Sequence, residues 1–265
     1  MLLKQALPAA AVLNLASAYL AIRKPGALKG YVSKCMQHYR DAVGTGLKPA
    51  NPFEFLKTES RGQDEPSLCF ELPLKLSDDS GTRWEEQMCL GAVTRLLKPK
   101  AIFEIGTYNG RTTAIFALNS EPNVEIYSLD LPTDAMPDNL FTSDQELVKR
   151  RRTGYILEEL GLEKRYRQVL CDSIQFDPTP YAGKIELGFI DGGHSLAHVR
   201  NDTEKMAVMA GDRGIVFWHD YGGLGEFLPL TNYLEALSKT IPIYRVPDMS
   251  LAWASMRDVA RLRGI

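Results

Sequence analysis

The sequence predicts an α/β fold: a doubly wound, mostly parallel sheet with helices on both faces, finished by an antiparallel pair of strands. Two observations lead to this prediction. Short apolar runs of strand length alternate with segments of helical periodicity from Ala101 to Trp218. Beyond them, the short runs Pro242–Val246 and Leu251–Ser255 are joined by Pro247–Ser250, which suits a hairpin and is too short for a crossover helix.

The elements follow in order. A helix is expected to begin at Thr82, because Thr82 and Glu85 have the spacing of a capping box. Four apolar residues at four-residue spacing should form its buried face: Trp84, Met88, Ala92 and Leu96. Strands are expected at Ala101–Ile105, Glu125–Leu129, Tyr166–Leu170, Ile185–Ile190 and Gly214–Trp218. Helices are expected at Arg111–Leu118, Asp144–Leu160, Ser195–Ala210 (with Gly211 as its C-cap) and Glu226–Lys239.

Residues 1–81 are interpreted as an N-terminal helical extension and linker, and residues 82–265 as the α/β domain. The linker includes Thr45–Ser67, which is rich in Pro, Gly and charge and is expected to be a connecting loop. The apolar run Ala6–Ile22 is expected to be a helix docked on protein, either its own body or a second subunit of a homo-oligomer. A helix on a membrane surface is a less favoured interpretation, and a signal or anchor segment is a third.

The composition is that of a globular protein, with 45% hydrophobic and 24% charged residues and a net charge of −2. Nothing in this charge balance favours binding to nucleic acid. The one basic cluster, Lys149–Arg152, is interpreted as a solvated helix face, with a site for an acidic substrate as the alternative. Because the four cysteines lack zinc-ligand spacing, we expect reduced thiols in a cytoplasmic protein.

The first candidate site lies at Phe103–Gly110, where a strand ends, a turn with Gly106 and Gly110 follows, and a helix begins. Such a turn lets the backbone approach a ligand, and the helix start offers free amides. Asp130 ends the next strand, where an acidic side chain can accept hydrogen bonds from both hydroxyls of a ribose. The structural alternatives are a tight turn that binds nothing and a plain turn aspartate.

Polar residues also follow the later strands. The carboxylate of Asp172, next to Ser173, could accept a hydrogen bond from an adenine amine, or either residue could cap a turn. Four side chains follow two strands expected to be neighbours: Asp191, His194, His219 and Asp220. We expect these four to converge, because the carboxyl ends of adjacent parallel strands line one crevice. His198, at a helical position without an evident partner, is interpreted as structural.

Taken together, these motifs resemble those of class I S-adenosylmethionine (SAM)-dependent methyltransferases. The nearest likeness is to the bacterial O-methyltransferase group of macrolide-sugar and rhamnosyl O-methyltransferases and cephalosporin-hydroxylase-like proteins. The resemblance covers roughly Thr82–Ser255 and implies a Rossmann-like, seven-stranded sheet of order 3-2-1-4-5-7-6 with its last strand antiparallel. It also implies the cofactor-binding residues, which are Glu104, Gly106, Thr107, Tyr108, Gly110, Asp130, Asp172, Ser173 and Asp191.

The resemblance further implies a catalytic base and a metal site. In metal-dependent relatives, an acid after strand four and an acidic pair after strand five hold Mg²⁺, and a histidine three residues beyond the first acid is the base. Asp191, Asp220 and His194 match these positions, so His194 and Asp191 are the expected catalytic residues. His219 replaces the first acid of the pair. The expected ligands are therefore Asp191, His219 and Asp220, with Mn²⁺ or Fe²⁺ as alternatives to Mg²⁺.

The function expected from the resemblance is methylation of a hydroxyl on a sugar, glycan or other small-molecule acceptor. A hydroxylase-like Fe(II) enzyme is an alternative, because His194, His219 and Asp191 are the two histidines and one carboxylate that such a site uses. An NAD enzyme is disfavoured, since the turn at Gly106–Gly110 lacks the middle glycine of G-x-G-x-x-G. A SAM-binding partner protein without catalysis is the remaining alternative.

Overall fold

The computed structural model describes residues 46–59, 68–73, 82–132, 134–135, 152–223 and 225–263, and six single positions: 23, 32, 35, 39, 141 and 145. The predicted helix at Ala6–Ile22, most of the insert Pro132–Leu147 and most of the basic cluster Lys149–Arg152 lie outside the described residues. In the part of the chain that is described, no helix is long and apolar enough to cross a membrane.

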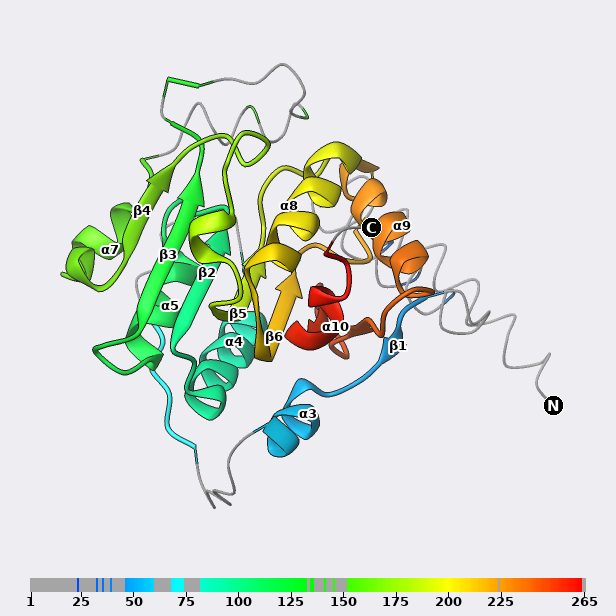
Figure 1. Cartoon of the computed structure of the whole chain (residues 1–265), viewed down its shortest axis with the longest axis horizontal. Coiled ribbons are helices and arrows are strands. Elements are labelled where there is room, and N and C mark those ends of the chain that lie inside the picture. The colour runs from blue at the N-terminus through cyan, green and yellow to red at the C-terminus, as the bar shows by residue number, and fades with distance from the viewer. Residues whose placement is uncertain are drawn as a thin grey trace.

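In the described part of the chain, eight strands form one mixed sheet, and Figure 1 labels six of these strands, β1 to β6. From one edge to the other, their order is β4, β3, β2, β5, β6, β8, β7 and β1. Their bounds are Arg167–Leu170, Glu125–Asp130, Ala101–Ile105, Ile185–Ile190, Ala210–Trp218, Ala252–Ser255, Tyr244–Arg245 and Lys48–Pro49. The first five are parallel, and β8 runs antiparallel to both β6 and β7. The predicted order 3-2-1-4-5-7-6 with a reversed last strand is confirmed.

An eighth strand joins this sheet, where the sequence had suggested seven strands and a loop. β1 pairs parallel with β7 at the edge, and α3 (Pro52–Glu59) follows it directly. The loop predicted for Thr45–Ser67 is therefore wrong over these residues. The prolines of this segment indicated a loop, but one of them stands at the start of a helix. Asn51 Oδ1 accepts a hydrogen bond from the amide of Phe53, and Pro52 suits the first helical position.

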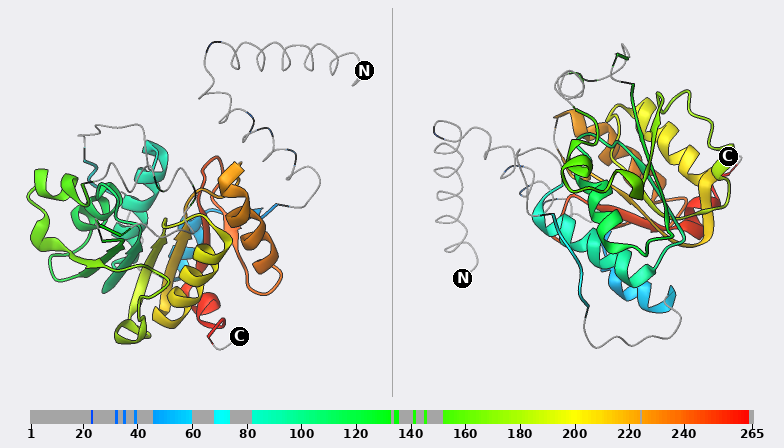
Figure 2. Two further views of the ribbon diagram at one scale, coloured as in Figure 1. Left: turned by 90° about the horizontal axis from the view of Figure 1, so that it is seen from above. Right: turned by 90° about the vertical axis from the view of Figure 1, so that its left-hand side faces the viewer.

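The apolar core has two layers, one on each face of the sheet. Successive strand residues point to opposite faces, so Ile215 and Phe217 belong to one cluster and Val216 and Trp218 to the other. The first layer is covered by α3, α4 (Trp84–Leu97) and α5 (Arg111–Asn119), and the second by α8 (Leu196–Met209), α9 (Leu228–Leu237) and α10 (Met256–Ala260). Figure 2 shows these helices on both sides of the strands.

The start of α4 differs from the prediction by one residue. Arg83 is the N-cap, and its amide donates to Glu86 Oε2 at 2.8 Å, so the acid of the capping box is Glu86 and not Glu85. The shift turns the helix, leaving Trp84 and Met88 exposed while Leu90, Val93 and Leu97 enter the core. The predicted buried face is therefore wrong for Trp84 and Met88.

Three other helix predictions need correction. Gly211 is a residue of β6 and not a helix C-cap, because α8 passes directly into that strand at Ala210. Within Asp144–Leu160, the described residues are helical at the single position Gln145 and in α7 (Tyr155–Glu159), which begins after Gly154 at φ +73°. The helix predicted at Glu226–Lys239 begins with the 3₁₀ turn η3 (Gly225–Phe227) before α9.

Candidate active site

The candidate residues lie where parallel strands end at one edge of the sheet. Glu104, Asp130, Asp191 and His219 stand at or directly after the ends of β2, β3, β5 and β6, respectively. The ends of β2 and β5 are held together by the amide of Asp191, which donates to the carbonyl of Ile105 at 2.8 Å. This shared edge brings together residues that are far apart in the sequence, as expected for a doubly wound sheet.

The two glycines of the turn after β2 are required by the packing of the protein itself. Gly106 has φ +102°, and a Cβ there would lie 2.0 Å from the carbonyl oxygen of Asp191. Gly110 has φ +87°, and its Cβ would meet Leu157 and Gly154 at 2.7 and 2.9 Å. Both glycines were expected to allow close approach of a ligand, but in the structure neighbouring protein atoms occupy the space beside each.

Glu104 is fully buried within β2. Its Oε2 accepts hydrogen bonds from Thr113 Oγ1 and from Ser128 Oγ, the latter at 2.6 Å, while Oε1 has no hydrogen-bond partner among the described residues. Burial, reinforced by the charges of Asp191 and Asp130, outweighs these hydrogen bonds and raises the pKa of Glu104 to about 8. The site therefore contains a carboxyl group that would gain a favourable contact from a cationic or hydrogen-donating ligand.

Asp130 is hydrogen bonded to the backbone on both sides. Its Oδ2 accepts the amide of Tyr108 at 2.8 Å, and its Oδ1 accepts the amide of Leu131 at 2.7 Å. Tyr108 has φ +46°, a left-handed conformation that is uncommon for a side chain of this size. The preceding residue, Thr107, is fixed by hydrogen bonds of its hydroxyl with the side chains of Ser128 and Gln168. The carboxylate is thus held at the mouth of the turn after β2.

Asp172 and Ser173 follow β4 and form a capped turn. Asp172 Oδ1 accepts a hydrogen bond from the amide of Ile174 at 2.9 Å. Asp172 therefore caps a turn, which was the structural alternative to a contact with adenine. The Ser173 carbonyl accepts hydrogen bonds from Asn201 and Lys205 of α8. These contacts connect the turn after β4 to the helix that follows β5.

The turn after β5 packs closely against α8. A Cβ at Gly192 would lie 3.0 Å from the buried Asp202, and one at Gly193 would lie 2.8 Å from the ring of His198. His198 Nδ1 is 2.8 Å from Ser195 Oγ, the N-cap of the helix, which agrees with the structural role predicted for it. The two glycines therefore allow the helix to fix the turn that carries Asp191 and His194.

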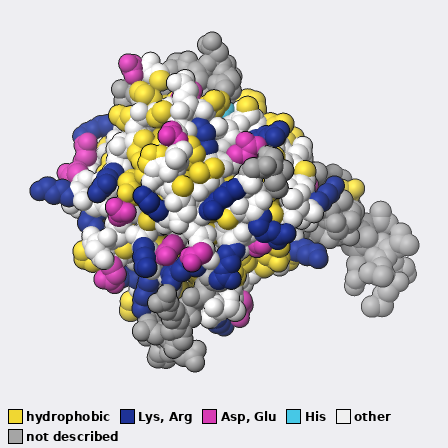
Figure 3. All heavy atoms as spheres, viewed as in Figure 1, with side chains coloured by type: hydrophobic (Ala, Val, Ile, Leu, Met, Phe, Trp, Pro, Cys, Tyr) yellow, Lys and Arg dark blue, Asp and Glu magenta, His cyan; other side chains and the backbone are white. Residues whose placement is uncertain are grey.

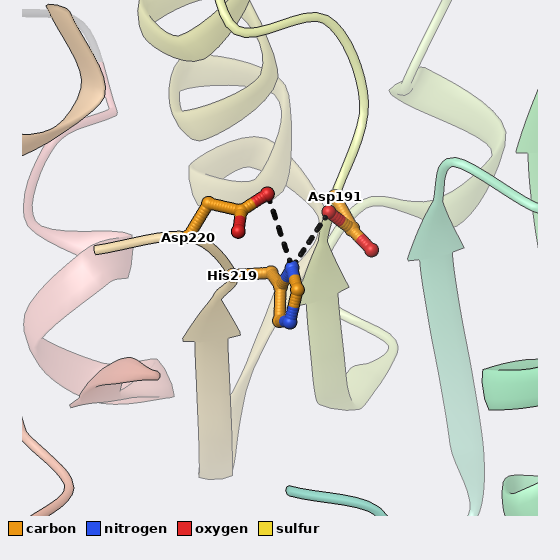
Figure 4. A group of neighbouring side chains, drawn as sticks. All are labelled: Asp191, His219 and Asp220. Atoms are coloured by element: carbon orange, nitrogen blue, oxygen red, sulfur yellow. Dashed lines mark ion pairs between the residues drawn. The ribbon is translucent and has the colours of Figure 1, made fainter. Parts of the chain in front are cut away.

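The four predicted side chains do converge. His219 Nδ1 lies 3.2 Å from Asp191 Oδ1 and 3.3 Å from Asp220 Oδ2, as Figure 4 shows. His194 Nε2 is 3.1 Å from the same Asp220 oxygen. Asp220 has φ +60°, a strained backbone conformation for a residue other than glycine. Among the described residues, one group of side chains is suited to hold a metal ion, and it consists of Asp191, His219 and Asp220.

Sequence reasoning missed Glu86, which contacts this group from the first turn of α4. The side chain is fully buried, and its Oε2 lies 3.2 Å from His219 Nε2. Its other oxygen accepts hydrogen bonds from the amide and the hydroxyl of Ser250, in the turn between β7 and β8. The sequence contains two adjacent acids, Glu85 and Glu86, and the predicted cap assigned the capping role to Glu85. Because the N-cap is Arg83 and not Thr82, it is Glu86 that points inward.

These contacts set the charges of the group. Burial alone would lower the pKa of His219, but the charges of Asp191 and Asp220 raise it well above its usual range. Burial alone would raise the pKa of Glu86 and of Asp220, yet hydrogen bonds and the charge of His219 hold both well below the usual range. Without a bound cation, the imidazolium of His219 therefore balances the surrounding carboxylates.

His194 is restrained from two sides. Asp220 contacts its Nε2, and the ring of Phe227 packs edge-on against the imidazole with 4.8 Å between the ring centroids. Phe227 approaches this closely because Gly223 has no side chain there: a Cβ would lie 2.6 Å from Phe227 Cβ. The histidine is thus presented in a defined orientation beside the other three residues.

Residues 103–221, which include Asp191, His194, His219 and Asp220, match a family described as a methyltransferase domain. A search of curated proteins found no similar sequence. The matched segment runs from β2 to the residue after Asp220, so it contains the turn after β2, Asp130 and the converging cluster.

Solved structures are similar to this chain at low sequence identity. A candidate caffeoyl-CoA O-methyltransferase from Staphylococcus aureus has a TM-score of 0.50 and 14% identity over 86% of this chain and 97% of that one. A methyltransferase from Podospora anserina, bound to SAH, has a TM-score of 0.49 and 14% identity over 76% and 84% of the two chains. The O-methyltransferase TomG from Streptomyces achromogenes, which acts in tomaymycin synthesis and was solved with SAM, has a TM-score of 0.46 and 13% identity over 65% and 79%. At 14% identity, the likeness to the Staphylococcus aureus structure concerns the fold alone.

Proposed function

We propose that this chain, a class I SAM-dependent methyltransferase by its fold and by the match of residues 103–221, transfers the methyl group to an oxygen of a hydroxylated small molecule or glycan. The observation that carries the proposal is the pairing of His194 with Asp220 beside Asp191 and His219. A hydroxyl is a poor nucleophile until its proton is removed, and a histidine oriented by a carboxylate is suited to remove it.

The residues around the turn after β2 fit SAM. Glu104 Oε1 is buried without a partner among the described residues, and the ammonium of the methionine part of SAM would supply one. The carboxylate of Asp130 is held by two amides at the end of β3, where it could accept the ribose hydroxyls. The adenine would lie toward Asp172 and Ser173, the turn after β4.

In the reaction that we propose, the acceptor oxygen attacks the methyl carbon in line with the sulfur. The C–O bond forms as the C–S bond breaks, and the sulfur keeps the electron pair, giving S-adenosylhomocysteine. Asp220 accepts a hydrogen bond from Nε2–H of His194 when the ring is neutral, so Nδ1 is the nitrogen that would take the hydroxyl proton. Phe227 keeps the ring from turning away. A positioned base of this kind contributes about 10²- to 10⁴-fold to the rate.

We also propose that Asp191, His219 and Asp220 hold a divalent cation. His219 Nδ1 is buried without a hydrogen bond of good geometry, although two carboxylate oxygens lie 3.2 and 3.3 Å away. Adjacent ligands about 2.1 Å from an octahedral cation are about 3.0 Å apart, so these two separations fit His219 as a neighbouring ligand of each carboxylate. A bound cation would stabilise the negative charge that develops on the acceptor oxygen. An imidazole among the ligands favours Mn²⁺ or Fe²⁺ over Mg²⁺.

The alternative of an Fe(II) oxygenase lacks this support. It requires two histidines and one carboxylate around the metal, whereas the converging donors in the described part are one histidine and two carboxylates. His194 is instead paired with Asp220.

The test is to incubate the purified protein with SAM and a panel of hydroxylated sugars, glycans and phenols, with and without Mn²⁺. Mass spectrometry should find products heavier by one methylene, together with S-adenosylhomocysteine. His194→Ala should lower kcat at least about 10²-fold and leave the Kd for SAM within a few-fold. A parallel incubation with Fe²⁺ and 2-oxoglutarate serves as the control. Products formed only in that control would overturn the proposal, and an unimpaired His194→Ala would remove the base.

A further inference from the structure

The side chain of Glu86 makes more contacts than a capping residue needs. It is 0% exposed, and its two oxygens face five donors from three parts of the chain. Oε1 accepts from Arg83 Nη2 at 3.0 Å, from the Ser250 amide at 2.9 Å and from Ser250 Oγ at 2.5 Å. Oε2 accepts from the Arg83 amide at 2.8 Å and lies 3.2 Å from His219 Nε2. Glu86 therefore connects the start of α4, the β7–β8 turn and the metal-site histidine.

These contacts determine which nitrogen of His219 carries hydrogen. An ionised carboxylate only accepts hydrogen bonds, and four donors from Arg83 and Ser250 favour the ionised form of Glu86. Nε2 must then be the donor in the contact with Glu86. In a neutral imidazole one nitrogen carries hydrogen and the other has a lone pair. With Nε2–H directed at Glu86, the lone pair is on Nδ1, which faces Asp191 and Asp220.

We propose that Glu86 is a positioning residue for the metal site: its carboxylate holds Nε2–H of His219 so that Nδ1 is presented as a ligand between Asp191 and Asp220. The inference rests on the metal site proposed above. Metal-bound histidines commonly donate their second N–H to a carboxylate, which fixes the ring and makes it a better ligand. Loss of such a carboxylate typically lowers metal affinity about 10- to 100-fold.

The position of Glu86 in the fold supports this role. The residue belongs to α4, before the matched segment 103–221, and reaches His219 across the end of β6. An apolar side chain at this position would leave the part-buried amides of Ser250 and Arg83, and Nε2 of the buried His219, without their present acceptor, which is costly. The ring of His219 also packs against Phe189, with 6.0 Å between centroids and a tilt of 49° between the rings, so the imidazole is restrained by packing as well as at Nε2.

The experiment is a titration of metal-free protein with Mn²⁺ in the absence of SAM, followed by electron paramagnetic resonance of the free ion. The wild type and four variants are compared: Glu86→Ala, Glu86→Gln, Asp191→Asn and Glu85→Ala. Glu85→Ala is the matched control, because it removes an exposed carboxylate from the same helical turn. Circular dichroism and thermal melting establish that each variant is folded.

The expected result is one Mn²⁺ site in the wild type and in Glu85→Ala. Its affinity should fall about 10- to 100-fold in Glu86→Ala and by less in Glu86→Gln, whose amide oxygen can still accept Nε2–H. Asp191→Asn changes a proposed ligand, so it should weaken Mn²⁺ binding whether or not Glu86 has the proposed role. In the Zn²⁺-loaded protein, long-range ¹H–¹⁵N spectra of the His219 ring, assigned with His219→Gln, should show Nε2–H with Nδ1 bound to metal. A merely structural contact would not require that tautomer.

The outcomes separate the inference from the proposal on which it rests. If Glu86→Gln is folded and both Glu86 variants bind Mn²⁺ as the wild type does, while Asp191→Asn does not, the metal site stands and the role of Glu86 is overturned. A ring bound to Zn²⁺ through Nε2 would overturn it as well. If the wild type binds neither Mn²⁺ nor Zn²⁺, the metal site fails together with the inference, and methyl transfer through His194 is still open to its own test.

Discussion

Replacing the buried Glu104 by glutamine should change how the stability of the protein depends on pH. Glu104 keeps its proton in the folded state up to a pKa of about 8, whereas the same group in the unfolded chain has a pKa near 4.5. Between these values the unfolded state binds fewer protons than the folded state. Stability contributed by the protonated carboxyl is therefore fully present below about pH 4.5 and is lost as pH rises toward 8.

The magnitude follows from this interval. One pKa unit corresponds to about 1.36 kcal/mol, so the interval of about 3.5 units corresponds to about 5 kcal/mol, to order of magnitude. Glutamine has nearly the same shape and stays neutral, and its amide can use the hydroxyls of Ser128 and Thr113. Near pH 5 the two proteins should be similarly stable. By pH 8 the variant should be the more stable by several kcal/mol.

The difference in free energy of unfolding between Glu104→Gln and the wild type can be measured by urea unfolding at a series of pH values, about 5.5, 6.5, 7.5 and 8.5. That difference should grow by about 1.4 kcal/mol per pH unit from about pH 5 and level off near pH 8. The control is Glu125→Gln in the neighbouring strand β3, whose side chain is 50% exposed. If the wild type and Glu104→Gln have the same dependence on pH, Glu104 is ionised in the folded protein and the reasoning fails.

Three further outcomes are expected. Asp130→Ala should weaken SAM binding, measured by calorimetry, at least about 10-fold, because two hydrogen bonds to a charged acceptor are lost; unchanged affinity in a folded variant refutes the ribose assignment. Gly106→Ala should destabilise the protein by more than about 3 kcal/mol, because φ is +102° and the new Cβ would overlap the Asp191 carbonyl; a stability equal to wild type in denaturant would show that the turn is more tolerant than its geometry implies. Asp202→Asn should raise the melting temperature at pH 7.5 but not at pH 4. Burial raises the pKa of Asp202 to about 6, so ionisation of this carboxyl above pH 3.8 destabilises the folded state, and asparagine stays neutral. An equal effect at both pH values would contradict this.

On the face seen in Figure 3, basic and acidic side chains are interspersed with apolar ones. The absence of nucleic acid binding, the acceptor class and the homo-oligomer therefore stay predictions. No disulfide joins the four cysteines in the part of the chain that the structure describes, and reduced thiols in a cytoplasmic protein stay a prediction.

The sequence by itself determined the sheet and most of the site. Alternating apolar runs and helical segments predict a parallel sheet, because only a crossover element can connect parallel strands. The short linker at Pro247–Ser250 predicts the reversed last strand for the same reason. Asp191, His194, His219 and Asp220 could be brought together from sequence, since each follows an apolar strand and parallel strands end at one edge.

Three features could be found only in the tertiary structure: the contacts of Glu86, the reason why position 106 requires glycine, and the eighth strand of the sheet. Each depends on contacts between segments far apart in the chain: α4 with the β7–β8 turn, the turn after β2 with the backbone of Asp191, and β1 with β7. Local propensity contains no information on such neighbours, so a one-residue shift of a helix cap was enough to conceal a buried carboxylate. The physical reason is that a helix turns by about 100° per residue, and the side that meets the core is fixed by packing and not by the cap signal alone.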